Sequence, residues 1–168
     1  MAEIPALTCV NGRLQRLGGG NQPTVVVDYA HTSDALHNVL SALREHGSMA
    51  VVCVFGCGGD RDRGKRALMA QVACLADRVV VTTDNPRSEE PEAIIADVLA
   101  GLQPDQHNKV TVVVDRAEAI HYAVNGAKKS DVVLIAGKGH ETYQESKGIR
   151  YPFSDLTEVV GALSGRNA

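Results

Sequence analysis

Short runs of β-branched residues alternate with longer segments of helical periodicity, and this alternation constrains the fold more than any other feature. The runs lie at 24–28, 49–55, 79–82, 110–114 and 132–135. Between them, apolar residues recur every three or four positions, as at Leu36, Leu40 and Leu43. Strands separated by such helices pair in parallel through right-handed crossovers. The sequence therefore predicts an α/β fold: a doubly wound, mostly parallel, Rossmann-like sheet of about six strands with helices on both faces.

Capping and turn residues suggest where these elements begin and end. Ser33 is expected to cap the first helix, and Gly47 to end it. Residues 143–151 are expected to add a hairpin or an edge strand. Further helices are expected at 64–76, 91–102, 117–124 and 155–163.

Residues 1–168 are expected to form a single domain, because a chain of this length can bury a core of its own. Residues 1–23 are weakly patterned, with a short run at 13–17 that suits a strand and then three consecutive glycines. We expect this stretch to be either an edge hairpin or the remnant of a linker.

Composition excludes several classes of function. A formal net charge of -3 provides no global basic field, so binding to nucleic acid is not expected. No apolar run approaches the roughly 20 residues of a membrane span. The opening residues Met1, Ala2 and Glu3 do not resemble a signal or transit peptide, so we expect a cytoplasmic protein without membrane contact.

The four cysteines do not form the framework of a secreted disulfide-rich protein. Cys53 and Cys74 fall within a predicted strand and a predicted helix, so both are expected in the core. Only Cys57, in a glycine loop, is expected to be exposed. The Cys53/Cys57 spacing is not that of a usual zinc knuckle, and we expect no metal site.

Three polar loops follow predicted strands, at 56–63, 84–87 and 137–141. The carboxyl ends of parallel strands meet at one edge of a sheet, where ligands bind. The guanidinium of Arg87 matches a carboxylate, and Asn85 adds an amide beside it. Glu141 offers an acceptor for an ammonium group. The loops therefore suit a zwitterion, for which an amino acid is the simplest candidate; the alternative is a set of surface charges on neighbouring loops.

The segment from Gly59 to Lys65 has the spacing of a phosphate-binding P-loop, Gly-x-x-x-x-Gly-Lys. Arg66 follows where such loops carry Ser or Thr, and two aspartates inside the loop would repel phosphates. A charged loop that directs Arg61 at an anionic ligand fits better. A solvated turn that caps a helix is the third interpretation.

The segment from Asp28 to Asp34 stands at the end of the first long strand. Asp28 and His31 are candidates for contacts with a ribose or with phosphates. An equally good interpretation of His31 is a residue that begins a helix and contacts no ligand.

Four strings, each in a loop that follows a strand, occur in the same order in the Mur ligases of peptidoglycan synthesis, and the chain resembles their C-terminal domain from about Gly12 to Leu163. The strings are Asp28–Thr32 (Asp-Tyr-Ala-His-Thr), Phe55–Asp62 (Phe-Gly-Cys-Gly-Gly-Asp-Arg-Asp), Asp84–Arg87 (Asp-Asn-Pro-Arg) and Gly137–Glu141 (Gly-Lys-Gly-His-Glu). The Asp-Asn-Pro-Arg string is similar to that of the family branch that adds meso-diaminopimelate.

The resemblance implies a role for each matching residue. Asn85 and Arg87 would hold the carboxylate at the far stereocentre of meso-diaminopimelate, and Glu141 would face its ammonium group. Arg13 and Asp28 match positions that border the ATP ribose in related ligases, with His31 beside them. The residues implied for meso-diaminopimelate are Arg61, Asp84, Asn85, Pro86, Arg87, Gly137 and Glu141.

The implied chemistry is ATP-dependent amide ligation. ATP phosphorylates the D-glutamate side chain of UDP-N-acetylmuramoyl-L-alanyl-D-glutamate, and the amino group of meso-diaminopimelate attacks the acyl phosphate. In the family, ATP, Mg²⁺ and the nucleotide precursor are held by domains that have no counterpart here. We therefore expect an isolated domain with no catalytic residue of its own, inactive alone, that orients the nucleophile.

Two interpretations from other classes compete with this one. A free-standing nucleotide hydrolase would use Gly59 to Lys65 as its phosphate loop and lose ATP hydrolysis in Lys65→Ala. A non-catalytic α/β binding module would respond to no small ligand and would be indifferent to Arg87→Ala.

Overall fold

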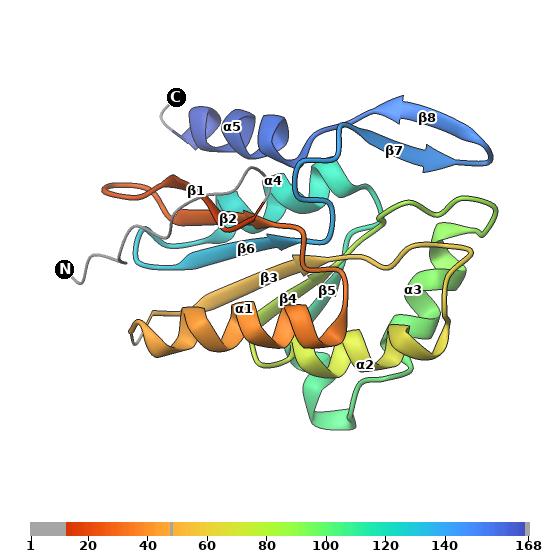
Figure 1. Ribbon diagram of the computed structural model, residues 1–168. Coiled ribbons are helices and arrows are strands. Elements are labelled where there is room, and N and C mark those ends of the chain that lie inside the picture. Colours follow the sequence, from red (N-terminus) through yellow and green to blue (C-terminus); the bar gives the residue numbers. More distant parts are fainter. Residues whose placement is uncertain (1–12, 48, 167–168) are drawn as a thin grey trace.

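The computed structural model describes residues 13–47 and 49–166. Its elements alternate along the chain as expected (Figure 1), and the fold class predicted from the sequence is confirmed. They are β1 (Gln15–Gly18), β2 (Thr24–Asp28), α1 (Ser33–Glu45), β3 (Val51–Phe55), α2 (Gly64–Ala73), β4 (Arg78–Val81), α3 (Pro91–Leu99), a 3₁₀ helix (Pro104–Lys109), β5 (Val110–Val112), α4 (Arg116–Gly126), β6 (Val132–Ala136), β7 (Tyr143–Ser146), β8 (Ile149–Pro152) and α5 (Asp155–Arg166).

The main sheet has six strands in the order β1-β2-β6-β3-β4-β5. β1 is antiparallel to β2, and the other neighbours pair in parallel. β6 enters between β2 and β3, with Val133 opposite both Val25 and Val52. The four inner strands are therefore paired on both edges, and β2, β3 and β6 are buried along their whole length, as their continuous apolar runs require.

Helices cover both faces of the sheet (Figure 1). On one face, α1, α2 and α3 pack a core that includes Leu36, Leu40 and Met69. On the other, α4 and α5 pack a second core that includes Ile120 and Val159. Because the loops after β3 and β6 lead to opposite faces, a crevice opens between the carboxyl ends of these neighbouring strands.

The residue that caps α1 differs from the expected one. Thr32 is the N-cap, and its Oγ1 accepts a hydrogen bond of 3.2 Å from the Ala35 amide, while Ser33 is already helical. Thr32 has the extended backbone that a capping residue needs, which composition alone does not distinguish from that of Ser33. The helix ends at Glu45, with His46 as its C-cap.

The C-terminal tail forms the hairpin of β7 and β8, which is a separate two-stranded sheet. Figure 1 shows it extending from the carboxyl edge of the main sheet, beyond α4. Arg87 pairs with Ser146 in an isolated parallel bridge, so the hairpin is attached to the loop after β4.

β1 is an edge strand of the main sheet and lies within the stretch expected to be a hairpin or a linker remnant. Residues 1–12 of that stretch, which include Cys9, lie outside the described residues. Within the described part of the chain, no helix is long and apolar enough to cross a bilayer.

Candidate functional site

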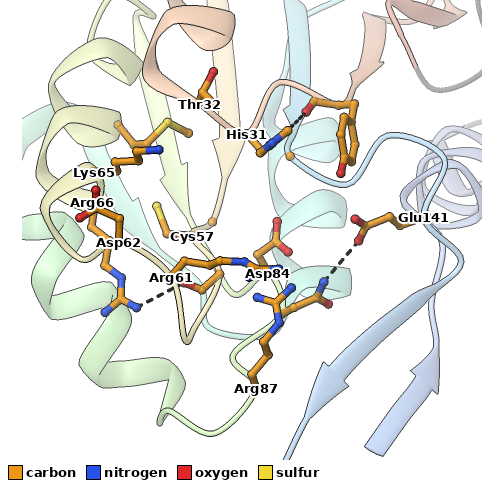
Figure 2. Close-up of a pocket in the computed structure, with 16 residues that line it drawn as sticks. His31, Thr32, Cys57, Arg61, Asp62, Lys65, Arg66, Asp84, Arg87 and Glu141 are labelled. Atoms are coloured by element: carbon orange, nitrogen blue, oxygen red, sulfur yellow. Dashed lines mark hydrogen bonds between the residues drawn. The ribbon is translucent and has the colours of Figure 1, made fainter. Parts of the chain in front are cut away.

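The loops that follow β2, β3, β4 and β6 surround a pocket of about 420 Å³ at the carboxyl edge of the sheet. Figure 2 shows Asp62 and Lys65 near α2, with Asp84, Arg87 and Glu141 grouped away from them. Seven residues singled out from the sequence line this pocket: His31, Arg61, Asp84, Asn85, Arg87, Gly137 and Glu141. Pro86, Arg13 and Asp28 are not among the lining residues.

Glycines allow the loop after β3 to lie directly on the loop after β4. A Cβ atom at Gly59 would stand 1.9 Å from the backbone oxygen of Pro86, and one at Gly56 would stand 2.5 Å from that of Thr82. The Gly59 amide donates to the carbonyl oxygen of Asn85 at 2.8 Å. Pro86 therefore acts through packing, and the two loops form one wall of the pocket.

Arg87 is fixed at its backbone by the β7–β8 hairpin. Its φ is +53°, a conformation that side chains rarely adopt. Its amide donates to the Glu145 carbonyl at 3.0 Å, and its carbonyl accepts from the Lys147 amide at 2.7 Å. These two bonds stabilise the unusual backbone conformation and direct the side chain toward the loop after β3.

The Arg87 guanidinium retains capacity for a ligand. Nη1 donates to the Gly59 carbonyl at 2.9 Å, and Nε lies 3.7 Å from the Glu145 carboxylate. Among the described residues, no partner of Nη2 occurs, and the side chain is 22% exposed. An anion that enters the pocket can therefore accept hydrogen bonds from this group.

Asn85 is buried and fully engaged on its oxygen side. Oδ1 accepts from Lys138 Nζ at 2.8 Å and from the Glu145 amide at 3.0 Å. Nδ2 donates to Glu141 Oε2 at 3.3 Å (Figure 2). One Nδ2 proton satisfies Glu141, and the second is available to a ligand acceptor.

The pocket carries both signs of charge. Asp84 and Glu141 supply carboxylates, while Arg61 and Lys65 are exposed cations that form no ion pair within the described residues. Gly137 has a φ of +118°, and a Cβ there would stand 2.9 Å from Asp84 Oδ2, so a side chain would displace that carboxylate.

The geometry argues against a phosphate loop at Gly59 to Lys65. A P-loop needs free amides around the phosphate. Here the amide of Asp60 donates to Glu89 Oε1 at 2.9 Å, and that of Gly64 donates to Asp62 Oδ1 at 2.9 Å. Two of the loop's amides are thus engaged within the chain, and the nucleotide hydrolase is not favoured.

Arg66, which stands where a P-loop has its hydroxyl, is buried. It donates to Glu89 at 2.7 Å, to Asp97 at 2.8 Å and to the Gly58 carbonyl at 3.2 Å. The hydrogen bond from Arg66, with one from the Asp60 amide, lowers the pKa of Glu89 to about 2. Arg66 therefore holds the loop together and is not available to a ligand.

Of the residues matched to an ATP ribose, His31 lines the pocket, while Asp28 is buried outside its lining. The Asp28 carboxylate accepts from the amides of Leu14 and Ala30, both at 2.8 Å, which places Arg13 next to it. His31 Nδ1 donates to the Tyr29 carbonyl at 2.8 Å, and the two rings lie 4.5 Å apart. Both Asp28 oxygens thus accept from backbone amides, which ties the loop after β2 to the segment that leads into β1.

Cys57 is the least buried of the described cysteines, as expected, but it is only partly exposed. The thiol is partly buried under the pocket, and burial, with the nearby Asp84 carboxylate, raises its pKa to about 12. A thiol of this kind is a poor nucleophile at neutral pH. Cys53 and Cys74 are buried, as expected.

Three buried charged residues near the site were not identified from the sequence. Lys138 is fully buried beneath the pocket, although it belongs to the Gly-Lys-Gly-His-Glu string. Arg116 and Asp155 form a buried pair at 2.7 Å, and Arg116 also donates to the Ala136 and Thr83 carbonyls at the ends of β6 and β4. Burial by itself lowers the pKa of Arg116, but Asp155, together with the Asp84 and Glu141 carboxylates, outweighs it and the pKa is raised.

A crevice at the carboxyl edge of a doubly wound sheet, lined by three arginines, an amide and three carboxylates, defines a small-molecule domain that suits an amino acid. A family model for the Mur ligase, glutamate ligase domain, matches residues 12–139. The chain belongs to the Mur ligase family and contains its glutamate ligase domain.

The chain is similar to ligases named for 2,6-diaminopimelate. It is 56% identical over 162 residues to the UDP-N-acetylmuramoyl-L-alanyl-D-glutamate--2,6-diaminopimelate ligase of Pseudomonas aeruginosa, covering 96% of this chain and 33% of that protein. It is 52% identical over 164 residues to the enzyme of the same name from Coxiella burnetii, covering 97% and 33%. The chain thus spans about a third of the length of these relatives.

Solved structures agree with this assignment. A structure of a ligase of the same name superposes with a TM-score of 0.89 at 47% identity, covering 98% of this chain and 34% of that one. Escherichia coli FolC in complex with ADP superposes with a TM-score of 0.59 at 20% identity, covering 94% and 32%, and shares the fold alone.

Proposed function

We propose that this chain is the amino-acid-binding domain of an ATP-dependent ligase that adds meso-diaminopimelate to UDP-N-acetylmuramoyl-L-alanyl-D-glutamate. The observation that carries the proposal is the pairing of opposite charges in one pocket. Arg87 offers donors to an anion, while Glu141 and Asp84 offer acceptors on the same side of the pocket. The names of the relatives at 52% to 56% identity support the same substrate.

The distal end of meso-diaminopimelate carries one carboxylate and one ammonium group, and the pocket has a counterpart for each. Arg87 and the free Nδ2 proton of Asn85 would bind the carboxylate, and Arg61 would approach it from the loop after β3. Glu141 would accept from the ammonium group. L-lysine lacks this carboxylate and would leave a largely buried guanidinium without its partner, which is the physical basis of selectivity.

In the proposed reaction, the amino group attacks an acyl phosphate on the D-glutamate side chain. A C–N bond forms, the C–O bond to phosphate breaks, phosphate leaves, and the attacking nitrogen loses a proton to water. ATP supplies the activating phosphoryl group, and Mg²⁺ would be held with it outside this chain. Arg13, Asp28 and His31 would border the ribose. The residues described here bind and orient the nucleophile, so the contribution of the domain is proximity.

The proposal extends to organisation and location. We propose that the described residues act as one domain, since a single main sheet carries both cores. Catalysis would require closure against a domain that binds ATP. A ligase that consumes ATP and a nucleotide-linked precursor would work in the cytoplasm.

An amide-resolved NMR titration of this chain with meso-diaminopimelate and, separately, L-lysine tests the proposal. Selective shifts at Asn85, Arg87 and Glu141 with meso-diaminopimelate are expected. Equal responses to both ligands would refute the assigned specificity. If neither ligand produces shifts, the same titration in the complete ligase decides whether the pocket requires a second domain, and continued silence there would overturn the proposal. A binding module of another kind would ignore Arg87→Ala.

A further inference from the structure

Lys138 is 0% exposed, although it carries an ammonium group and lies in a loop. Its Nζ lies 2.8 Å from Asn85 Oδ1, 3.2 Å from Glu141 Oε2 and 3.6 Å from Asp84 Oδ1. The Tyr143 ring covers it with a centroid distance of 5.9 Å. Lys138 therefore lies behind the pocket wall and contacts three of the residues proposed to read the ligand.

The contacts of Lys138 determine which way the Asn85 amide points. A lysine ammonium and a backbone amide can only donate, so the Asn85 atom that faces Lys138 Nζ and the Glu145 amide must be oxygen. The NH₂ group is then directed to the side of Glu141 and the pocket. Without the lysine, the Asn85 oxygen would lose one of its two donors, and only the Glu145 amide and Glu141 would hold the NH₂ group toward the pocket.

Lys138 also sets the local charge. Asp84 and Glu141 contribute two negative charges, and Lys138 offsets one of them. Arg116 lies behind the same wall but is matched by its own partner, Asp155. Removal of Lys138 would make the site more negative, which opposes a ligand carboxylate and favours a ligand of greater positive charge.

We propose that Lys138 is a specificity-determining positioning residue, which selects an amino acid with a distal carboxylate by holding the Asn85 amide as a donor and by offsetting the negative charge of Asp84 and Glu141. The inference rests on the proposed function for the identity of the ligand. The orientation of Asn85 does not depend on the proposed function, because it is a property of the chain without ligand.

The first test needs no ligand. The side-chain NH₂ resonances of Asn85 are compared by ¹⁵N NMR between wild type and Lys138→Met, with Lys129→Met as the matched control, since Lys129 is exposed and distant from the site. Lys138→Met is expected to shift or broaden these resonances, and Lys129→Met to leave them unchanged. Unchanged Asn85 resonances in Lys138→Met would overturn the inference.

The second test measures selectivity. The dissociation constants for meso-diaminopimelate and L-lysine are measured by NMR titration for the same three proteins. Lys138→Met is expected to reduce the preference for meso-diaminopimelate by about tenfold, because both the amide and the charge act on the distal carboxylate. A loss of affinity that is equal for both ligands would indicate a purely structural role and overturn the inference.

If Lys138→Met does not fold, a second variant provides the test. Lys138→Met/Asp84→Asn removes one charge of each sign, so the net charge of the cluster stays as in wild type, while Asn85 still lacks its lysine donor. Both readouts apply to it, with Asp84→Asn as its reference. If wild type binds neither ligand, the titration in the complete ligase decides the proposed function, and the Asn85 resonances alone decide the role of Lys138.

Discussion

Substitution of Arg87 by alanine is expected to weaken binding of meso-diaminopimelate and leave the fold intact. One hydrogen bond of the guanidinium already goes to the Gly59 carbonyl, so only part of its donor set is available to a ligand. A charge-assisted hydrogen bond is worth about 1.5 to 3 kcal/mol. A loss of about 2 kcal/mol of binding free energy corresponds to roughly 30-fold weaker binding.

The same substitution should have a small effect on stability. The ion pair with Glu145 spans 3.7 Å and is partly exposed, and pairs of this kind contribute about 0 to 1 kcal/mol. The two backbone hydrogen bonds between Arg87 and the β7–β8 hairpin do not involve the side chain. Chemical denaturation of wild type and variant should therefore give midpoints that differ little.

Isothermal titration with meso-diaminopimelate and with L-lysine measures the effect of Arg87→Ala on binding. The affinity for L-lysine should not fall, since this ligand offers no distal carboxylate to Arg87 and no longer leaves a guanidinium unpaired. Arg150→Ala is a matched control, because it removes an exposed guanidinium from the β7–β8 hairpin. There Arg150 lies over the Tyr143 ring. If Arg87→Ala binds meso-diaminopimelate as tightly as Arg150→Ala does, the reasoning about Arg87 is wrong.

Three further substitutions test the packing and electrostatics around the site. Gly59→Ala should destabilise the chain by about 1 to 3 kcal/mol in urea unfolding and abolish the ligand response, because its Cβ would stand 1.9 Å from a backbone oxygen. Arg116→Met should cost about 3 to 5 kcal/mol of unfolding free energy, since it leaves the buried Asp155 carboxylate unpaired. Glu89→Gln should lower the urea midpoint at neutral pH. The hydrogen bond from Arg66 depresses the pKa of Glu89 to about 2, so its contribution is fully present above the ordinary value of 4.5 and disappears as the pH falls toward 2.

Each of these predictions has its own control. Gly165→Ala adds a Cβ in open space within α5 and should be neutral or slightly stabilising; a similar cost at Gly59 and Gly165 would contradict the packing argument. Arg116→Met/Asp155→Leu removes both charges and should cost less than Arg116→Met alone. For Glu89→Gln, a deficit in the urea midpoint that persists unchanged at low pH would show that the carboxylate's charge is not its source.

The site was partly predictable because loop positions are a local property of the sequence. Each of the strings that contain Arg61, Asn85 and Glu141 directly follows an apolar run, and parallel strands place their carboxyl ends together. The charge types of these residues, and hence the class of ligand, follow from the sequence alone. Arg87 and Glu141 were expected to lie together for this reason alone.

Other features depend on contacts between distant segments, which no local pattern encodes. Thr32 and Ser33 are both good capping residues, and only the backbone conformation distinguishes them. Cys57 follows a glycine in a loop, yet the packing of that loop on its neighbour partly buries the thiol.

The sequence by itself determined the alternation of strands and helices, the parallel sheet and the chemical character of the loops, because periodicity and turn residues act over a few positions. Only the tertiary structure determined which charged groups are paired inside the protein and which face the pocket. Arg66 and Lys138 carry the same charge as Arg61 and Lys65, yet the first two are buried against carboxylates and the last two face the pocket. The burial of a residue depends on segments distant in the sequence that pack against it. The fold therefore determines whether a charged residue supports the structure or contacts a ligand.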